Sequence, residues 1–231
     1  MSDATGAGSA AAQNAGAAGL VKAPTGIGGF DEITRGGLPR GRATLVTGGA
    51  GSGKTLFGLE FLVWGAQEFG EPGVLLSFEE SAAELATNVA SLGFDLPELE
   101  REGLLAVDAF RIDAGAVVAG GFDLEGLFIR LGRAVDSIGA KRVVLDTVEV
   151  LFTALGSEST VRAEVSRLLR WLKDRGLTVI ITGEPGRSGS PVVATTLAAS
   201  AVSIPTPCLA LSRDLSAAGN ADQDSCSSHM V

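Results

Sequence analysis

Residues 48–55 read Gly-Gly-Ala-Gly-Ser-Gly-Lys-Thr, which matches the pattern G-x-x-x-x-G-K-T of a phosphate-binding P-loop. The apolar, β-branched run at 43–47 before it is typical of a buried parallel strand. Large apolar side chains recur at helical spacing after it, and we expect Gly65 and Gly70 to mark the end of that helix. The sequence therefore predicts a strand, a glycine loop and a helix in the order that a P-loop requires.

The loop contains residue types that suit the phosphates of a nucleotide. Its glycines, Gly48, Gly51 and Gly53 among them, allow successive backbone N–H groups to converge on phosphate oxygens at a helix N-terminus. Lys54 would reach the outer phosphates, and the Thr55 hydroxyl would hold Mg²⁺, a hard cation that prefers oxygen ligands. An ordinary glycine-rich turn is the alternative, and the full pattern in its full context disfavours it.

Composition narrows the class of protein. The chain has 231 residues and a net charge of −9, which argues against a strongly basic nucleic-acid surface and against an anionic membrane as partner. Its two cysteines, Cys208 and Cys226, make neither a disulfide framework nor a zinc site, so we expect a reducing, cytoplasmic location. No apolar run reaches the length of about 18 residues that a membrane span needs.

The order of predicted elements indicates an α/β fold. We expect residues 1–23, rich in alanine and glycine, to form a flexible tail, residues 24–184 to form the domain, and residues 185–231 to contain at most short strands, one of them within 198–204. Within the domain, strands alternate with helices, one of them opened by the capping box Ser81–Glu84 and another capped by Asp123. This pattern predicts a mostly parallel central sheet with helices on both faces. The predicted strands are 43–47, 73–78, 104–107, 142–146 and 177–182.

Three acids fall where ligands bind in such a fold, at the carboxyl ends of strands. Asp146 ends an apolar strand, and an acid in that place holds Mg²⁺ directly or through water in P-loop enzymes, although it could instead cap a loop. Glu79 and Glu80 follow the strand after the P-loop helix. One of them could orient and deprotonate a water that attacks the γ-phosphate, or the pair could be solvated residues that complement a helix dipole.

With these residues in place, the chain resembles the KaiC family of circadian-clock ATPases in the RecA-like group, and specifically its N-terminal ATPase domain. The resemblance covers about residues 25–184. The P-loop alone occurs in many families, whereas the paired glutamates and the later GGFDL stretch point to this one. The resembling segments are GFDEITRGGLPRGRATLVTGGAGSGKTLFGLEF, EPGVLLSFEES, VVAGGFDLEGLFIRL, RVVLDTVEVLF and VRAEVSRLLRWLKDRG, in that order.

The resemblance implies a RecA-like P-loop ATPase that hydrolyses ATP slowly with Mg²⁺. It implies ATP-driven hexamers with nucleotide held between subunits, and clock-type protein partners. It favours Glu79 as the general base with Glu80 beside it, and it places a serine, here Ser91, near the adenosine. It assigns Mg²⁺ to Thr55 and the nucleotide to Gly51, Ser52, Gly53, Lys54, Thr55 and Leu56.

The sequence also departs from the family pattern. The family carries two such domains in tandem, with serine/threonine autokinase activity in the second, which has no counterpart here. The family's first domain continues with a Lys-x-Arg-Gly stretch that reaches the neighbouring subunit's nucleotide, and residues 185–231 contain no such stretch. We therefore expect a divergent or truncated C-terminus, with hydrolysis and hexamer formation weakened or lost.

Two other functions remain open at this point. A RecA- or RadA-like recombination ATPase acting on DNA shares the glycine-rich entry and the P-loop. The acidic charge, the GGFDL stretch and the absence of an N-terminal cysteine cluster disfavour it. The second is a nucleotide-binding or interaction module that has lost catalysis, which binding without turnover would support.

Overall fold

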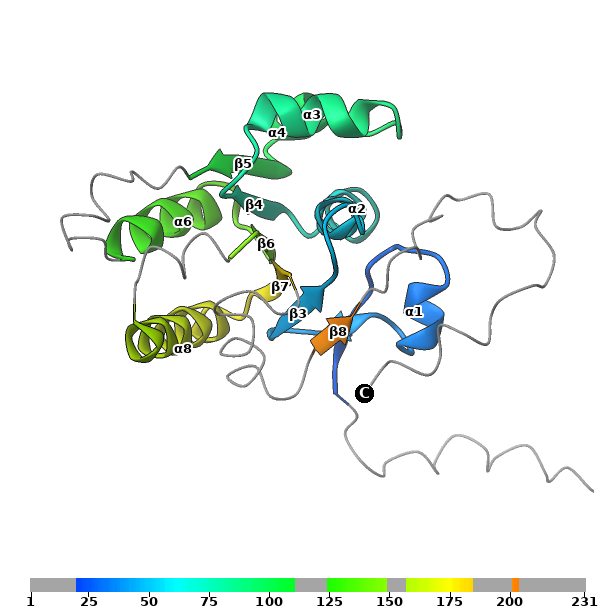
Figure 1. The fold of residues 1–231 in the computed structure, drawn as a ribbon. Coiled ribbons are helices and arrows are strands. Elements are labelled where there is room, and N and C mark those ends of the chain that lie inside the picture. Colours follow the sequence, from blue (N-terminus) through cyan, green and yellow to red (C-terminus); the bar gives the residue numbers. More distant parts are fainter. Residues whose placement is uncertain (1–19, 111–123, 149–156, 185–200, 204–231) are drawn as a thin grey trace, which may run out of the picture.

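A parallel sheet of six strands forms the centre of the chain (Figure 1). The computed structural model describes residues 20–110, 124–148, 157–184 and 201–203. The strand order is β5-β4-β6-β7-β3-β8, so β7 lies between the strand that enters the P-loop and the strand that ends in Asp146. The strands are β3 (Ala43–Thr47), β4 (Gly73–Ser77), β5 (Leu105–Ala109), β6 (Arg142–Asp146), β7 (Thr178–Gly183) and β8 (Ala201–Ser203). A small antiparallel pair, β1 (Lys22–Ala23) and β2 (Leu38–Pro39), and the short helix α1 (Phe30–Ile33) precede β3.

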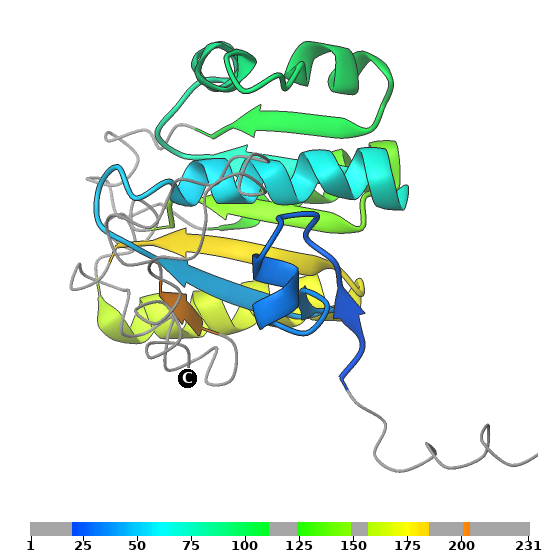
Figure 2. The ribbon, with the colours of Figure 1, turned by 90° about the vertical axis from the view of Figure 1, so that its right-hand side faces the viewer.

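Helices cover both faces of the sheet (Figures 1 and 2). On one face lie α2 (Lys54–Phe69), α3 (Ala82–Ala90) and α4 (Leu96–Arg101), over a buried cluster that includes Leu75, Val144 and Ile180. On the other lie α6 (Glu125–Ile138) and α8 (Glu158–Asp174), over a cluster that includes the alternate strand residues Leu76, Leu145 and Ile181. Each central strand is therefore apolar on both sides, as parallel strands between two helix layers must be. The predicted α/β class with helices on both faces is confirmed.

Most predicted elements form close to their predicted bounds. β6 has them unchanged, α3 opens with the reciprocal Ser81–Glu84 capping box, and β8 lies within 198–204. The third strand lies slightly later than predicted, at Leu105–Ala109. Asp123, predicted as a helix cap, lies outside the described residues, as do most of 1–23 and 185–231. Sequence reasoning did not predict α1, α4 or the β1–β2 pair, because all are too short to show a period.

The prediction that Gly65 helps to end the P-loop helix is wrong, because α2 continues to Phe69 and ends at Gly70 in the left-handed conformation. Gly65 serves packing instead. A Cβ atom on Gly65 would lie 2.4 Å from Cδ of Arg142, the fully buried first residue of β6. The glycine thus makes room for a buried arginine between helix and sheet.

Arg142 is compensated on several sides. Its Nε donates to Glu71 Oε2 at 2.7 Å and its Nη1 to the Phe61 carbonyl oxygen at 2.9 Å, and its guanidinium lies 4.5 Å from the Phe61 ring centroid. Glu71 also accepts from Arg40. Burial lowers the pKa of Arg142, and the Glu71 carboxylate partly restores it. Arg142 thus ties the middle of α2, through Phe61, and the segment after α2, through Glu71, to the start of β6.

We expect Glu71→Ala to destabilise the fold by about 3 kcal/mol, because it leaves the Arg142 guanidinium buried without its carboxylate. Urea unfolding at pH 7 measures the loss. The control is Arg101→Ala, which removes an exposed ion pair with Glu98 and should cost less than about 1 kcal/mol. An equal loss of unfolding free energy in the two variants would contradict the view that the buried Glu71–Arg142 pair stabilises the fold more than an exposed ion pair does.

The same pair predicts a dependence of stability on pH. Burial alone would raise the pKa of Glu71, but the hydrogen bonds and charges of Arg40 and Arg142 outweigh it, and the pKa lies below its ordinary value of 4.5. A carboxyl whose pKa is lower in the folded state contributes stability above its unfolded pKa and loses that contribution as pH falls through the folded value. The difference in unfolding free energy between parent and Glu71→Ala should therefore shrink below pH 4.5. An unchanged difference in acid would refute this.

Candidate nucleotide-binding site

The loop after β3 has the backbone that an anion site needs. Gly51 and Gly53 have φ angles of 71° and 84°, values that side chains rarely tolerate. Gly53 is also the N-cap of α2, so no side chain caps the helix and its first N–H groups point out of the helix end. Four N–H groups without intrahelical partners, together with the helix dipole, favour a phosphate at this point.

Two side chains of the loop are positioned for an anion. Lys54 is 6% exposed, and its Nζ donates to the carbonyl oxygens of Gly48 and Gly49, each at 2.9 Å. Ser52 is 4% exposed, and its hydroxyl has no hydrogen-bond partner among the described residues. A buried hydroxyl without a partner is costly unless a ligand supplies one. The ammonium, the hydroxyl and the uncapped helix end therefore fit the phosphates of a nucleotide.

A second part of the site is built between α2 and β6. A Cβ atom on Gly58 of α2 would lie 2.8 Å from Val144 Cγ1, so this glycine lets the helix approach the strand closely. As a result Thr55 Oγ1 donates to Asp146 Oδ2 at 2.8 Å. Thr182, at the end of β7, donates its hydroxyl to the other carboxylate oxygen, Oδ1.

The chemistry of these groups fits Mg²⁺. Asp146 is 5% exposed, and no lysine or arginine in the described part of the chain forms an ion pair with it. A buried carboxylate without a cation is unfavourable, and a hydroxyl beside it completes a pair of hard oxygen donors. The described residues contain no group of three or more acidic, histidine or cysteine side chains that could hold a metal alone. The carboxylate of Asp146 and the hydroxyl of Thr55 suit Mg²⁺, which takes one or two protein ligands and completes its shell with phosphate and water.

The predicted glutamates lie beside this part. The Phe78 N–H donates to the Asp146 carbonyl oxygen at 2.7 Å, which places the segment after β4 against the end of β6. Glu80 accepts from Asn88 Nδ2 at 2.9 Å, and its own N–H donates to Ser77 Oγ at 3.1 Å. Glu79 is exposed, and no described residue hydrogen-bonds its carboxylate. Of the two, Glu79 is the one free to bind a water.

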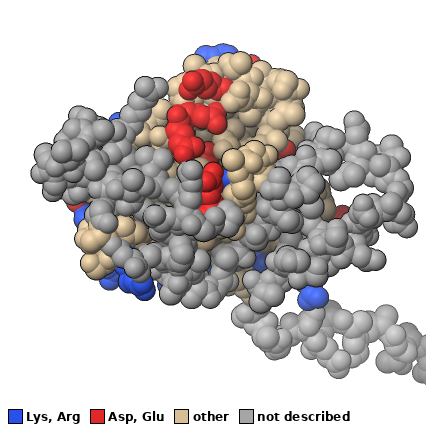
Figure 3. Space-filling view, viewed as in Figure 1, with Lys and Arg blue, Asp and Glu red and all other residues tan. Residues whose placement is uncertain are grey.

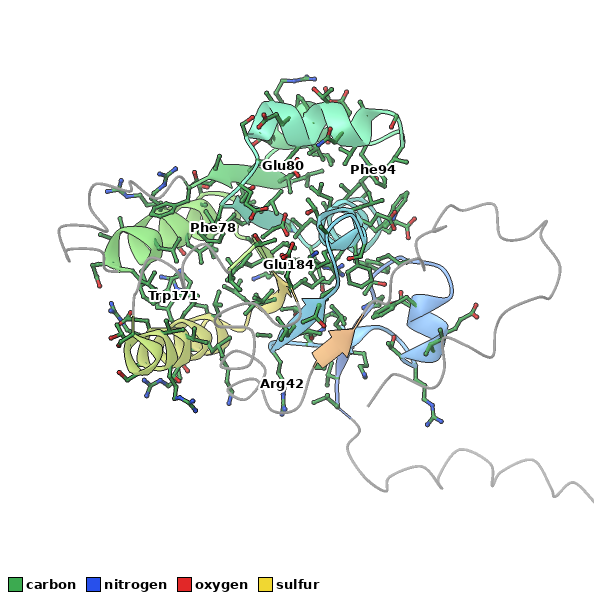
Figure 4. All side chains as sticks on the ribbon, in the orientation of Figure 1. Arg42, Phe78, Glu80, Phe94, Trp171 and Glu184 are labelled. Atoms are coloured by element: carbon green, nitrogen blue, oxygen red, sulfur yellow. The ribbon has the colours of Figure 1, made fainter. Side chains whose placement is uncertain are left out.

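An acidic groove runs from these glutamates along α3. It has a volume of about 520 Å³ and is lined by Glu79, Glu80, Ala83, Glu84, Thr87 and Asn88. Figure 3 shows acidic side chains gathered in a band on this face, and Figure 4 places Glu80 next to the start of α3 and Glu184 directly after β7. Among the described residues at the carboxyl ends of the strands, Lys54 is the one buried cation.

The remaining predicted residues lie at the margin of the site. Leu56 is half-buried in the first turn of α2, next to Thr55. Ser91 is exposed at the C-terminal end of α3, and among the described residues its side chain makes no hydrogen bond to the loop. Its helix α3 lies over the carboxyl ends of the strands, and α4 lies over their amino ends (Figure 2).

Sequence reasoning missed Thr182. The available signal was a polar residue that ends the buried run 177–182, with the same strand-end position as Asp146. Its contact with Asp146 depends on β6 and β7 being neighbours, and strand order cannot be read from the sequence alone.

Comparison with known proteins agrees with the geometry. Residues 23–202 match the model of the family described as "ATPase: KaiC". The chain belongs to the KaiC family. This confirms the resemblance inferred from the motifs, identifies a KaiC-type ATPase domain, and disfavours the recombination ATPase acting on DNA.

Curated KaiC proteins align with most of this chain. Circadian clock protein KaiC2 of Synechocystis sp. is 60% identical over 168 residues, which cover 72% of this chain and 30% of that protein. Circadian clock oscillator protein KaiC of Parasynechococcus marenigrum is 44% identical over 166 residues, 71% of this chain and 32% of that protein. The KaiC of Synechococcus elongatus is 43% identical over 174 residues, 75% and 34% respectively. The chain spans about a third of the length of these KaiC proteins.

In the segments that the structure describes, no helix combines the length and the apolar character needed to cross a membrane.

Proposed function

We propose that this chain binds ATP with Mg²⁺ at residues 48–55 and hydrolyses it. The observation that carries the proposal is the uncapped N-terminus of α2, together with the buried Lys54 ammonium and the Ser52 hydroxyl, which has no partner among the described residues. Each of these groups is favourable to an anion, and the β- and γ-phosphates of a nucleotide engage all of them at once.

In this proposal, different residues bind the phosphates, bind Mg²⁺ and activate the attacking water. Backbone N–H groups of the loop, Lys54 and Ser52 bind the phosphates, and Leu56 and Ser91 lie toward the nucleoside. Thr55 and Asp146 would hold Mg²⁺, which when bound would neutralise charge that develops on the phosphate oxygens. Glu79 orients a water for attack on the γ-phosphate and takes its proton, with Glu80 fixed by Asn88 beside it.

We also propose that the chain acts in the cytoplasm as a homo-oligomer, with clock-type proteins as partners. The names of the circadian clock relatives support the clock-type partners. In the described residues the site contains a single cation, Lys54, so a cation from a neighbouring copy would add to its charge compensation. If none is supplied, binding without turnover is the second candidate, since the acids around the site would then be under-compensated.

The test is phosphate release from ATP by the purified full chain, with Mg²⁺ and with EDTA, beside its melting temperature in the same solutions. We expect Mg²⁺-dependent turnover that DNA does not stimulate. ATP with Mg²⁺ at 100 times its dissociation constant should stabilise the fold by about 2.7 kcal/mol. Stabilisation without turnover would favour the binding module. The absence of both stabilisation and turnover would refute the proposal.

A further inference from the structure

Thr182 occupies a central position in the sheet. It lies on β7 between β3 and β6, opposite Val46 on one side, and it is fully buried. Leu145 pairs with Ile181 in the parallel register, so the next residues along the two strands, Asp146 and Thr182, are neighbours. Both share the parity of Val144 and Ile180 and so face α2, the helix that begins at the loop.

The Thr182 hydroxyl has one proton, and that proton is directed at Asp146. It donates to Oδ1, while the Leu145 carbonyl oxygen lies farther away at 3.4 Å. Thr55 occupies the opposite oxygen of the same carboxylate. The terminal torsion of an aspartate is broad, so one hydrogen bond leaves the carboxylate free to rotate, and a second from a rigid strand fixes its plane. Threonine suits this task because its β-branch restricts its own rotamers.

Other buried threonines show that this contact is not a general property of the sheet. Thr178 lies on the same strand and the same face, but at the opposite, amino end of the strand. There its hydroxyl accepts a hydrogen bond from the Gly41 N–H at 3.0 Å. The hydroxyl of Thr44, on β3, has no partner among the described residues. Of the buried threonines on the described strands, Thr182 alone hydrogen-bonds the Asp146 carboxylate, on the oxygen opposite to the one that Thr55 of α2 contacts.

We propose that Thr182 is a positioning residue for the binding of Mg²⁺. Its hydroxyl holds the Asp146 carboxylate turned toward Thr55. The inference rests on the proposed binding of ATP with Mg²⁺ and assigns to it a residue on a third strand. Hydrogen-bond partners of metal ligands typically change metal affinity by 10- to 100-fold when they are removed. The effect of Thr182 should therefore appear in the response to Mg²⁺ and not in nucleotide binding as such.

The test compares Thr182→Val, Thr182→Ser and Thr178→Val in the full chain. Binding of a fluorescent ATP analogue is measured in EDTA and at increasing Mg²⁺. Thr182→Val should need about tenfold more Mg²⁺ than the parent before its affinity for the analogue rises above the affinity in EDTA. The affinity in EDTA itself should be the same in the two proteins. Thr182→Ser keeps the hydroxyl and should retain the parent response. Thr178→Val removes a buried hydroxyl of the same strand and should also retain it.

The outcomes separate this inference from the proposed function. A parent chain whose binding is insensitive to Mg²⁺ would refute the proposed function and the inference together. Two outcomes would refute the inference alone, given a parent that responds to Mg²⁺. In one, Thr182→Val responds to Mg²⁺ as the parent does. In the other, Thr178→Val loses as much of the Mg²⁺ response as Thr182→Val. If Thr182→Val fails to fold, Thr182→Ala against Thr182→Ser asks the same question, and equal responses of that pair would refute it.

Discussion

Lys54→Ala is expected to abolish ATP turnover and to weaken binding of ATP with Mg²⁺ by roughly 100-fold or more. The ammonium of Lys54 is buried against the loop, where it donates to the Gly48 and Gly49 carbonyl oxygens. A phosphate oxygen would gain a charge-assisted hydrogen bond there, of about 3 kcal/mol. Acids line the groove that begins after β4, so Lys54→Ala also removes a buried positive charge that would offset them.

Melting temperature with and without ATP and Mg²⁺ measures this effect independently of catalysis. The matched control is Lys173→Ala, which removes the same charge from an exposed position near the end of α8 and should keep the full ligand shift. In the absence of ligand, Lys54→Ala should melt near the parent, because its hydrogen bonds are only to the loop itself. A ligand shift equal to that of the parent would rule out the loop as the phosphate site.

Glu79→Gln is expected to reduce turnover by roughly 10²- to 10⁴-fold, the usual contribution of a general base. Binding of ATP with Mg²⁺ should be almost unchanged, since Glu79 is exposed and is not part of the loop. Glutamine keeps the size of the side chain but cannot take a proton from water. Single-turnover phosphate release, with nucleotide affinity measured in parallel, separates the chemical step from binding.

Glu80→Gln provides the matched comparison. Glu80 already accepts a hydrogen bond from Asn88, and the amide oxygen of glutamine can accept it too, so this variant should lose much less turnover. If Glu80→Gln were the inactive variant and Glu79→Gln the active one, the roles of the two glutamates would be exchanged. Full turnover in both would exclude a general-base role for the pair.

The parts of the site that depend on local pattern were predictable. The P-loop, the capping box at Ser81 and the acid at the end of β6 each depend on a few adjacent residues, and the sequence places all of them at strand or helix ends. The family assignment also followed from the order of such segments, and the match over 23–202 confirms it.

The parts that depend on contacts between distant segments were not predictable. Thr182 meets Asp146 only because β6 and β7 are adjacent, and that order is set by the whole sheet. Arg142 follows a lysine and resembles an exposed strand start, yet Glu71 and the space above Gly65 allow it to be fully buried. The prediction of Gly65 as a helix terminator fails for the same reason, because nothing in the local sequence indicates that the Arg142 side chain occupies the space beside it.

The outer edge of the sheet at β5 bears on how copies of this chain can associate. The Val107 N–H, on the edge strand, donates to Glu100 Oε1 of α4 at 2.9 Å. A side chain of the same molecule thus occupies a backbone donor that an incoming strand would need, and it places a negative charge there. Such protected edges discourage sheet extension and amyloid-like aggregation. Copies that meet on this side are therefore expected to contact one another through side chains, without adding a strand to the sheet.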